Sequence, residues 1–320
     1  MFSRSVLAFA LSALTMPAFS QTYPDRPIRV IVGVPAGGTP DVMARSVTTG
    51  MSKILGQPLI MDNRGGAGGL IGTEVAAKAA PDGYTLLVSS PGPLTILPHM
   101  QKQLGYDPLR DFLPVGLIAS NPFLLIAHPS LPAKSIKELI ALAKAQPGKL
   151  SYASVGTGSP SHIAGELFKL RTGIDMVHIP YKGGGPAVTD AIGGQVPVLF
   201  VSMPAAWQHV KSGRLRALAV TSDTRSVVAP DLPTLAEAGV ADCVVNSWYG
   251  AFAPSKMPAP FVQKLNAALV KVLQMPDVRE RLLAQGAEAA PSSAADLDAI
   301  VKDELRKWET VIRDAKIRPE

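Results

Sequence analysis

The segment Val34–Asp41, with the sequence VPAGGTPD, constrains the fold of this chain more than any other stretch. It follows the apolar run Ile28–Val34, which predicts a buried strand, and precedes a helical pattern over Val42–Leu55. The backbone N–H groups of a first helical turn have no partner inside the helix, so they point into the corner between strand and helix. Such a corner favours a bound anion, although an ordinary turn between a strand and a helix is the alternative for this stretch alone.

The residue types within this segment suit an anion-binding corner. Gly37 and Gly38 allow the backbone to turn with positive φ and leave space beside it. We expect Thr39 to cap the helix and Pro40 to occupy its first position. Asp41 stands where a carboxylate is favoured by the helix dipole.

A second segment repeats this pattern. Gly156–Ser161, with the sequence GTGSPS, follows the apolar stretch Leu150–Val155 and precedes a helical pattern over Ile163–Leu170. Both segments place a glycine before a hydroxyl residue and a proline, which is a helix start with a hydroxyl cap. Two such corners, separated by about one domain length, indicate one ligand held between two lobes.

Length and composition support two lobes in an exported protein. With 320 residues and 47% hydrophobic content, the chain can bury a large core, and two lobes are favoured over one. Arg4, the apolar stretch Val6–Leu14 and the small-x-small sequence Ala18–Ser20 predict a signal peptide over residues 1–20, cleaved near Ser20. No other segment approaches the ~20 apolar residues of a membrane span, so we expect no membrane insertion of the mature chain.

Charge and cysteine content exclude other classes of function. The formal net charge of +6 fits a small anionic ligand, whereas the absence of a basic stripe with interleaved aromatic residues argues against nucleic acid. The single cysteine, Cys243, excludes an internal disulfide. The sequence contains none of the familiar hydrolase, zinc-protease or nucleotide-binding motifs, so we expect neither a metal nor a cofactor.

Short apolar runs alternate with helical patterns along most of the chain, which predicts an α/β protein with largely parallel strands. Ser89 and Ser90 follow the expected strand Tyr84–Ser89 and are candidate ligand contacts, with ordinary loop polarity as the alternative. Tyr181 opens a third glycine-rich helix start. His162 lies in the first turn of the second corner helix, where it either contacts the ligand or satisfies local backbone groups.

The pattern changes after the expected strand Trp248–Ala253. Three helical patterns follow without intervening strands, over Pro260–Leu273, Pro276–Gln285 and Ala294–Ala315. We expect this helical cluster to return to the first lobe. The chain then crosses twice between lobes, and two crossings form a hinge.

At several places the sequence resembles a known family, the Bug-type periplasmic solute-binding proteins of the tripartite tricarboxylate transporter system. The resemblance runs from about Tyr23 to the C-terminus. It rests on the order and spacing of Tyr23–Ile28, Ala36–Gly38 with Asp41 and Arg45, Asn63–Gly69, Pro81–Leu86, His162–Phe168, Pro180–Gly183 and Leu215–Thr221.

This resemblance implies a two-lobed periplasmic binding protein fold, type II-like, in which each lobe is a mostly parallel sheet flanked by helices. Residues 21–122 and 247–320 form the expected first lobe, and 123–246 the second. In the family, loops at the two corners hold a ligand carboxylate, largely through backbone groups and bridging waters. The expected ligand-binding residues are Val34, Ala36, Gly37, Gly38, Asp41, Ser89, Ser90, Gly156, Thr157, Gly158, Ser161, His162, Tyr181 and Ser202. Because a carboxylate repels a bound anion, we expect Asp41 to brace its corner through backbone hydrogen bonds.

Two departures from the family pattern bear on the ligand. Family members usually carry proline and an aromatic residue where Gly33 and Val34 stand, and many carry aspartate and asparagine where Val201 and Ser202 stand. If Val34 and Val201 line the pocket, an acid with an apolar body is favoured over aspartate, glutamate or citrate, because an unpaired ammonium is costly to bury. The alternative is that both valines belong to the core and that ordered waters select the ligand.

The predicted function is capture of a small organic carboxylate in the periplasm and its delivery to the membrane permease of a tripartite transporter. We expect a monomer without catalytic activity. Two alternatives stay open at this stage: a ligand-sensing partner of a receptor or sensor kinase, and a periplasmic enzyme acting on an anionic substrate.

Overall fold

The computed structural model describes residues 23–101, 103–314 and 317, so the expected signal peptide lies outside the described residues. The strands are β1 (Ile28–Val32), β2 (Leu59–Asn63), β3 (Thr85–Ser89), β4 (Phe112–Ala127), β5 (Ser151–Ser154), β6 (Val177–Pro180), β7 (Val198–Ser202), β8 (Arg216–Val220), β9 (Asn246–Pro254) and β10 (Glu288–Ala289). The α-helices are α1 (Thr39–Leu55), α2 (Leu70–Ala77), α3 (Leu97–Met100), α4 (Ile136–Ala145), α5 (Pro160–Thr172), α6 (Gly184–Ile192), α7 (Met203–Lys211), α8 (Ala259–Leu273), α9 (Pro276–Ala284) and α10 (Ala294–Asp314). A 3-10 turn, η1 (Ala67–Gly69), and a π-helical turn, η2 (Gly92–Ile96), precede α2 and α3.

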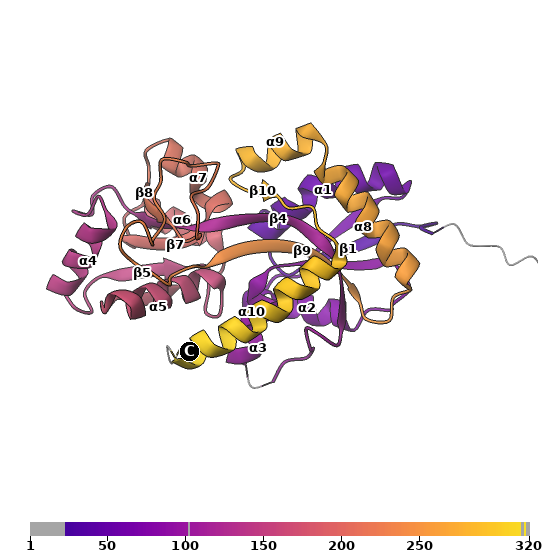
Figure 1. Ribbon diagram of the computed structural model, residues 1–320, viewed down its shortest axis with the longest axis horizontal. Coiled ribbons are helices and arrows are strands. Elements are labelled where there is room, and N and C mark those ends of the chain that lie inside the picture. Colours follow the sequence, from indigo (N-terminus) through magenta and orange to yellow (C-terminus); the bar gives the residue numbers. More distant parts are fainter. Residues whose placement is uncertain (1–22, 102, 315–316, 318–320) are drawn as a thin grey trace, which may run out of the picture.

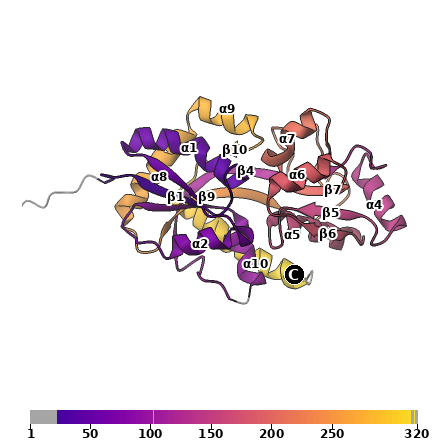
Figure 2. The ribbon, with the colours of Figure 1, turned by 180° about the vertical axis from the view of Figure 1, so that it is seen from behind.

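The strands follow the order β2-β1-β3-β9-β4-β7-β5-β6, with β8 and β10 also paired to β4. Figure 1 shows an elongated molecule in which β4 and β9 run lengthwise through the middle. The elements α1, α2, α8 and α9 gather around one end of this pair and α4, α5, α6 and α7 around the other, as the reverse view in Figure 2 also shows. We call these ends the β1 half and the β5 half.

The sheet is mixed, which differs from the expected largely parallel arrangement. Pairing is parallel between β1 and its neighbours β2 and β3, and between β5 and its neighbours β6 and β7. By contrast, β4 pairs antiparallel with β7, β8, β9 and β10. The reason is connectivity: β4 carries the chain from one half into the other and β9 carries it back, so the two lie side by side in opposite directions.

The last helix, α10, joins the apolar cores of both halves. Near its start, Leu297 and Val301 pack in a cluster with Phe252 of β9. Near its end, Trp308 packs in the cluster that contains Phe168 of α5. Figure 1 shows α10 lying diagonally beneath the paired strands β4 and β9, toward α3. The helix therefore does not return to the β1 half alone.

None of the helices within the described residues is long and apolar enough to cross a bilayer.

Candidate ligand-binding site

The first corner connects β1 to α1, and Gly38 rather than Thr39 is its N-cap. Gly38 has an extended backbone, with φ −67° and ψ 155°, and as a glycine it has no side chain that could cap the helix. Only Gly37 has the expected positive φ, of 83°. Because the helix begins one residue earlier than expected, the Thr39 hydroxyl is available elsewhere and lies 3.1 Å from Oγ of Ser202, at the end of β7. The predictions that Thr39 caps the helix and that Gly38 has positive φ are therefore wrong.

Asp41 braces this corner, as predicted. Its carboxylate accepts hydrogen bonds from the backbone N–H of Gly37 at 2.9 Å, from Nε of Arg45 at 2.9 Å and from Nδ2 of Asn63 at 3.0 Å. The side chain is 1% exposed. Burial alone would raise the pKa of Asp41, but the hydrogen bonds from Arg45, Gly37 and Asn63 and the charge of Arg45 outweigh it and hold the pKa below its usual value.

The second corner connects β5 to α5 and follows the predicted design. Ser159 is the N-cap, and its hydroxyl accepts from the backbone N–H of His162. Gly156 and Gly158 have φ of 133° and 75°, which a side chain would strain. The Ser161 hydroxyl accepts from the backbone N–H of Val155 at 3.0 Å and lies 3.0 Å from the Ser159 hydroxyl. The hydroxyl of Ser161 thus holds the corner together from within.

A pair of stacked histidines lies beneath the second corner. The ring centroids of His162 and His178 are 4.1 Å apart, and His162 is buried. Nδ1 of His162 accepts from the backbone N–H of Gly158 at 3.3 Å. Nε2 of His178 lies 2.7 Å from the Ser154 hydroxyl. Nδ1 of His162 therefore bonds a local backbone group, as one of the two alternatives for this residue predicted.

The remaining expected residues of the first corner and of β3 differ in burial. Val34 is half-buried against the core of the β1 half, and its carbonyl oxygen accepts from Nδ2 of Asn63 at 3.0 Å. Ala36 is exposed. Ser89 is buried at the end of β3, whereas Ser90 is half-buried.

Two residues of the β5 half are directed into that half. The Tyr181 hydroxyl donates to Oδ2 of Asp190 at 2.8 Å, and burial together with this neighbouring carboxylate raises the pKa of Tyr181 to about 12. Val201 is 0% exposed and belongs to the apolar cluster that contains Leu199. This burial favours the alternative that Val201 is a core residue.

The two halves approach each other closely at these corners. A methyl group on Gly92 of η2 would lie 3.6 Å from Cδ of Pro160 and 4.0 Å from the carbonyl oxygen of Gly158. One on Gly68 of η1 would lie 3.8 Å from the carbonyl oxygen of Thr157, a half-buried residue. The glycine-rich turns of the β1 half thus lie against the second corner, while Thr39 of the first corner contacts the end of β7.

A buried tyrosine completes the contact between the halves, and sequence reasoning missed it. The Tyr249 hydroxyl in β9 accepts from Ser247 at 3.1 Å and also interacts with the hydroxyls of Ser202 and Thr39. Burial raises the pKa of Tyr249 to about 12. Tyr249 lies in the middle of an apolar strand, where the sequence gives no sign of a polar role. The role of Asn63 could have been predicted from the sequence, because this residue ends β2, the strand that pairs with β1.

This arrangement presents hydrogen-bond donors to an anion. The backbone N–H groups of Thr39 and Ser161, in the first turns of α1 and α5, have no hydrogen-bond partner among the described residues. Each helix start also contributes partial positive charge. Within the described ranges there is no group of three histidine, cysteine or acidic residues that could hold a metal.

Comparisons with known proteins identify the family of this chain. Residues 43–317 match the family described as the tripartite tricarboxylate transporter family receptor. Protein BugT of Bordetella pertussis (strain Tohama I) is 40% identical over 306 residues, which are 95% of this chain and 94% of BugT.

Two solved structures are similar over most of their length. A protein from R. palustris solved with adipate has a TM-score of 0.89 and 36% identity, over 93% of this chain and 100% of its own. MatC from Rhodopseudomonas palustris with bound malate has a TM-score of 0.85 and 35% identity, over 91% of this chain and 100% of its own. The expected α/β binding-protein fold is confirmed by these matches. The chain belongs to the tripartite tricarboxylate transporter receptor family.

Proposed function

We propose that this chain captures a small organic carboxylate between two lobes and delivers it to the membrane subunits of a tripartite transporter. In this proposal the lobes are residues 21–122 with 247–320, and residues 123–246, and α10 packs against the cores of both. Receptors of this family are periplasmic, and the proposal includes export of this chain with cleavage near Ser20. The mature protein acts as a monomer and returns its ligand unaltered.

The observation that carries the proposal is the pair of helix starts where the two halves meet. Thr39 and Ser161 each supply a backbone N–H group without a partner among the described residues, and the surrounding side chains hold these corners in place. A preorganised corner loses little conformational entropy when a ligand binds. An anion that contacts both helix starts favours the closed arrangement over an open one.

A carboxylate is the anion that the relatives favour, since one was solved with adipate and another with malate. The preference for an apolar body now rests on Val34 alone, because Val201 belongs to the core. The proposed ligand is therefore a carboxylic acid whose body contacts Val34. We expect it to bind more tightly than glutamate, whose ammonium would have no partner at that position.

Calorimetry with adipate, malate, benzoate, glutamate and citrate tests the ligand class. We expect at least one of the first three acids to bind, and Gly38→Ala to weaken that binding ten-fold or more. A methyl group on Gly38 would lie 2.9 Å from Cγ2 of Val34 and 3.2 Å from the carbonyl oxygen of Pro35, so the corner must shift.

Gly193→Ala is the matched control. Gly193 also has a negative φ, of −73°, but a methyl group there would meet its nearest atom at 3.5 Å, an ordinary contact. Tightest binding of glutamate or citrate would contradict the apolar preference. If Gly38→Ala binds the acid as tightly as wild type, the first corner is not part of the binding site. Recovery of a chemically changed acid would show that the protein is an enzyme.

A further inference from the structure

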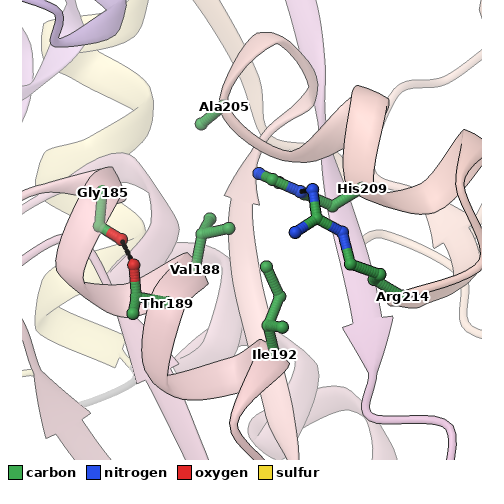
Figure 3. A pocket seen from close by; sticks show the side chains of 7 residues that line it. All are labelled: Gly185, Val188, Thr189, Ile192, Ala205, His209 and Arg214. Carbon is green, nitrogen blue, oxygen red and sulfur yellow. Dashed lines mark hydrogen bonds between the residues drawn. The ribbon is translucent and has the colours of Figure 1, made fainter.

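A second cavity lies away from the corners, between α6 and α7 in the β5 half. Its volume is about 350 Å³, and it is lined by Gly185, Val188, Thr189, Ile192, Ala205, His209 and Arg214. Figure 3 shows Val188 and Ile192 projecting from α6 toward α7, with Arg214 and His209 side by side at one edge. None of these residues belongs to the expected corner site.

The polar side chains of this cavity offer donors rather than acceptors. The Arg214 guanidinium lies 2.6 Å from Nδ1 of His209, and among the described residues it has no carboxylate partner. An arginine can only donate, so Nδ1 of His209 accepts and the ring proton resides on Nε2. In Figure 3 the second ring nitrogen of His209 points away from Arg214, toward Ala205.

The third polar side chain does not alter this balance. The Thr189 hydroxyl donates to the carbonyl oxygen of Gly185 at 3.0 Å, one turn earlier in α6. Burial and the charge of Arg214 lower the pKa of His209, so its ring is neutral at pH 7 and the pair carries a single positive charge. The cavity therefore has one positive charge and several N–H groups, from Arg214 and His209, beside the apolar side chains that line the rest of it.

We propose that the cavity between α6 and α7 is a second binding site, for a small monocarboxylate with an apolar body. The carboxylate pairs with Arg214, which binds such groups through two parallel N–H groups, and Nε2–H of His209 donates to the same anion. The apolar body packs on Val188, Ile192 and Ala205. The cavity volume lies at the lower end of the range for small-molecule sites, which suits a single ring or a short chain.

The test uses benzoate as the probe and the Ile192 methyl group as the reporter. The mature protein is labelled at isoleucine methyl groups, and the Ile192 signal is assigned with Ile192→Val. At pH 7, we expect benzoate to shift this signal in a saturable manner and benzamide, its neutral counterpart, to leave it in place. Arg214→Gln should weaken the benzoate response ten-fold or more.

Three further variants make the result specific. Lys211→Gln removes the positive charge of an exposed residue of α7 without changing the cavity lining, and should bind benzoate within two-fold of wild type. Gly185→Leu should block binding by filling the cavity, because a Cβ there meets nothing within 4 Å and the fold accepts it. Gly38→Ala should leave the Ile192 response intact, which separates this site from the first corner.

Each contrary result overturns the proposal. A stationary Ile192 signal up to high benzoate concentration shows that the cavity does not bind carboxylates. If the Ile192 signal shifts equally in Arg214→Gln and wild type, or equally with benzamide and benzoate, the site does not recognise the carboxylate charge. A response lost in Gly38→Ala assigns the effect to the corner site.

Discussion

The polar side chains of the two corners mainly hold backbone in place. Asp41 binds the N–H group of Gly37, and Ser161 binds that of Val155. Their substitution should therefore loosen the corner before it removes any direct contact with a ligand. The sequence indicated the residue types, but it could not tell a bracing hydroxyl from a ligand-binding one, because both occur at the same position of a helix start.

Replacing Asp41 should destabilise the protein. Asp41→Ala leaves the backbone N–H of Gly37 without its acceptor and removes one of the two hydrogen bonds that Nδ2 of Asn63 donates, the other being to Val34. Hydrogen bonds to charged groups contribute about 2 kcal/mol. We expect the free energy of unfolding, measured with urea, to fall by about that amount. Asp298→Ala, which breaks the exposed pair with Lys302, should change it by less than about 0.5 kcal/mol. Equal losses in the two variants would contradict the bracing role of Asp41.

At the scale of elements, β4 shows why sequence patterns fall short. The strand runs over 16 residues, from Phe112 to Ala127. Pro114, Gly116 and Pro122 interrupt the first part, and prolines are expected at edges or bulges rather than inside a strand. A register shift lies between Pro114 and Gly116 and a second between Leu117 and Ala119, whereas Pro122 pairs in register with Asn246 at the end of β9. These irregularities depend on the partner β9, so local sequence does not reveal them. The two-residue strand β10 is too short to leave a pattern.

Helix α10 carries a carboxyl group with an unusual environment. Burial raises the pKa of Glu304, although hydrogen bonds from Thr95 and Trp308 offset part of this effect. A raised pKa in the folded state means that folding takes up a proton. The associated stability is fully present below the unfolded pKa of ~4.3 and is lost as the pH rises through the folded value.

Glu304→Gln should therefore change stability in a pH-dependent way. The variant resembles the protonated acid at every pH, so its stability relative to wild type should increase as the pH rises from 4 to 7. Urea denaturation at a series of pH values measures this difference. Glu309→Gln, which removes an exposed carboxylate from the same helix, is the control. A Glu304→Gln profile that runs parallel to wild type would show that Glu304 titrates normally.

At the scale of the whole molecule, the two halves are joined by hydroxyl contacts as well as by the crossing strands. Thr39 at the start of α1 and Ser202 at the end of β7 meet at 3.1 Å, next to buried Tyr249. The two glycine-rich helix starts predicted the corners, and the helical cluster after Trp248–Ala253 predicted the two crossings. It could not predict this contact, because the partners are 163 residues apart and only the folded sheet brings them together.

Removing this contact should weaken ligand binding by favouring the open arrangement. We expect Ser202→Ala to reduce affinity for the bound acid several-fold, since one hydrogen bond contributes about 1 kcal/mol. The exposed Ser130→Ala should bind as wild type. Calorimetry measures the affinities, and unchanged binding by Ser202→Ala would show that the contact does not contribute to closure.

Ligand should also make the whole molecule more compact. If one anion contacts both halves, the radius of gyration measured by X-ray scattering should decrease when the acid identified by calorimetry is added to saturation. Ser202→Ala should begin from a larger radius without ligand and reach the same final value. Identical radii with and without ligand would indicate a rigid receptor.

The path of α10 also gives the protein a built-in optical signal. Of its three tryptophans, Trp308 is fully buried on α10 and Trp248 packs in the cluster with Leu297 and Val301 of the same helix. The third, Trp207, is half-buried on α7. In a Trp207→Phe variant, tryptophan fluorescence comes only from Trp308 on α10 and from Trp248, which packs against this helix. Its emission then follows the joint between the halves in unlabelled protein.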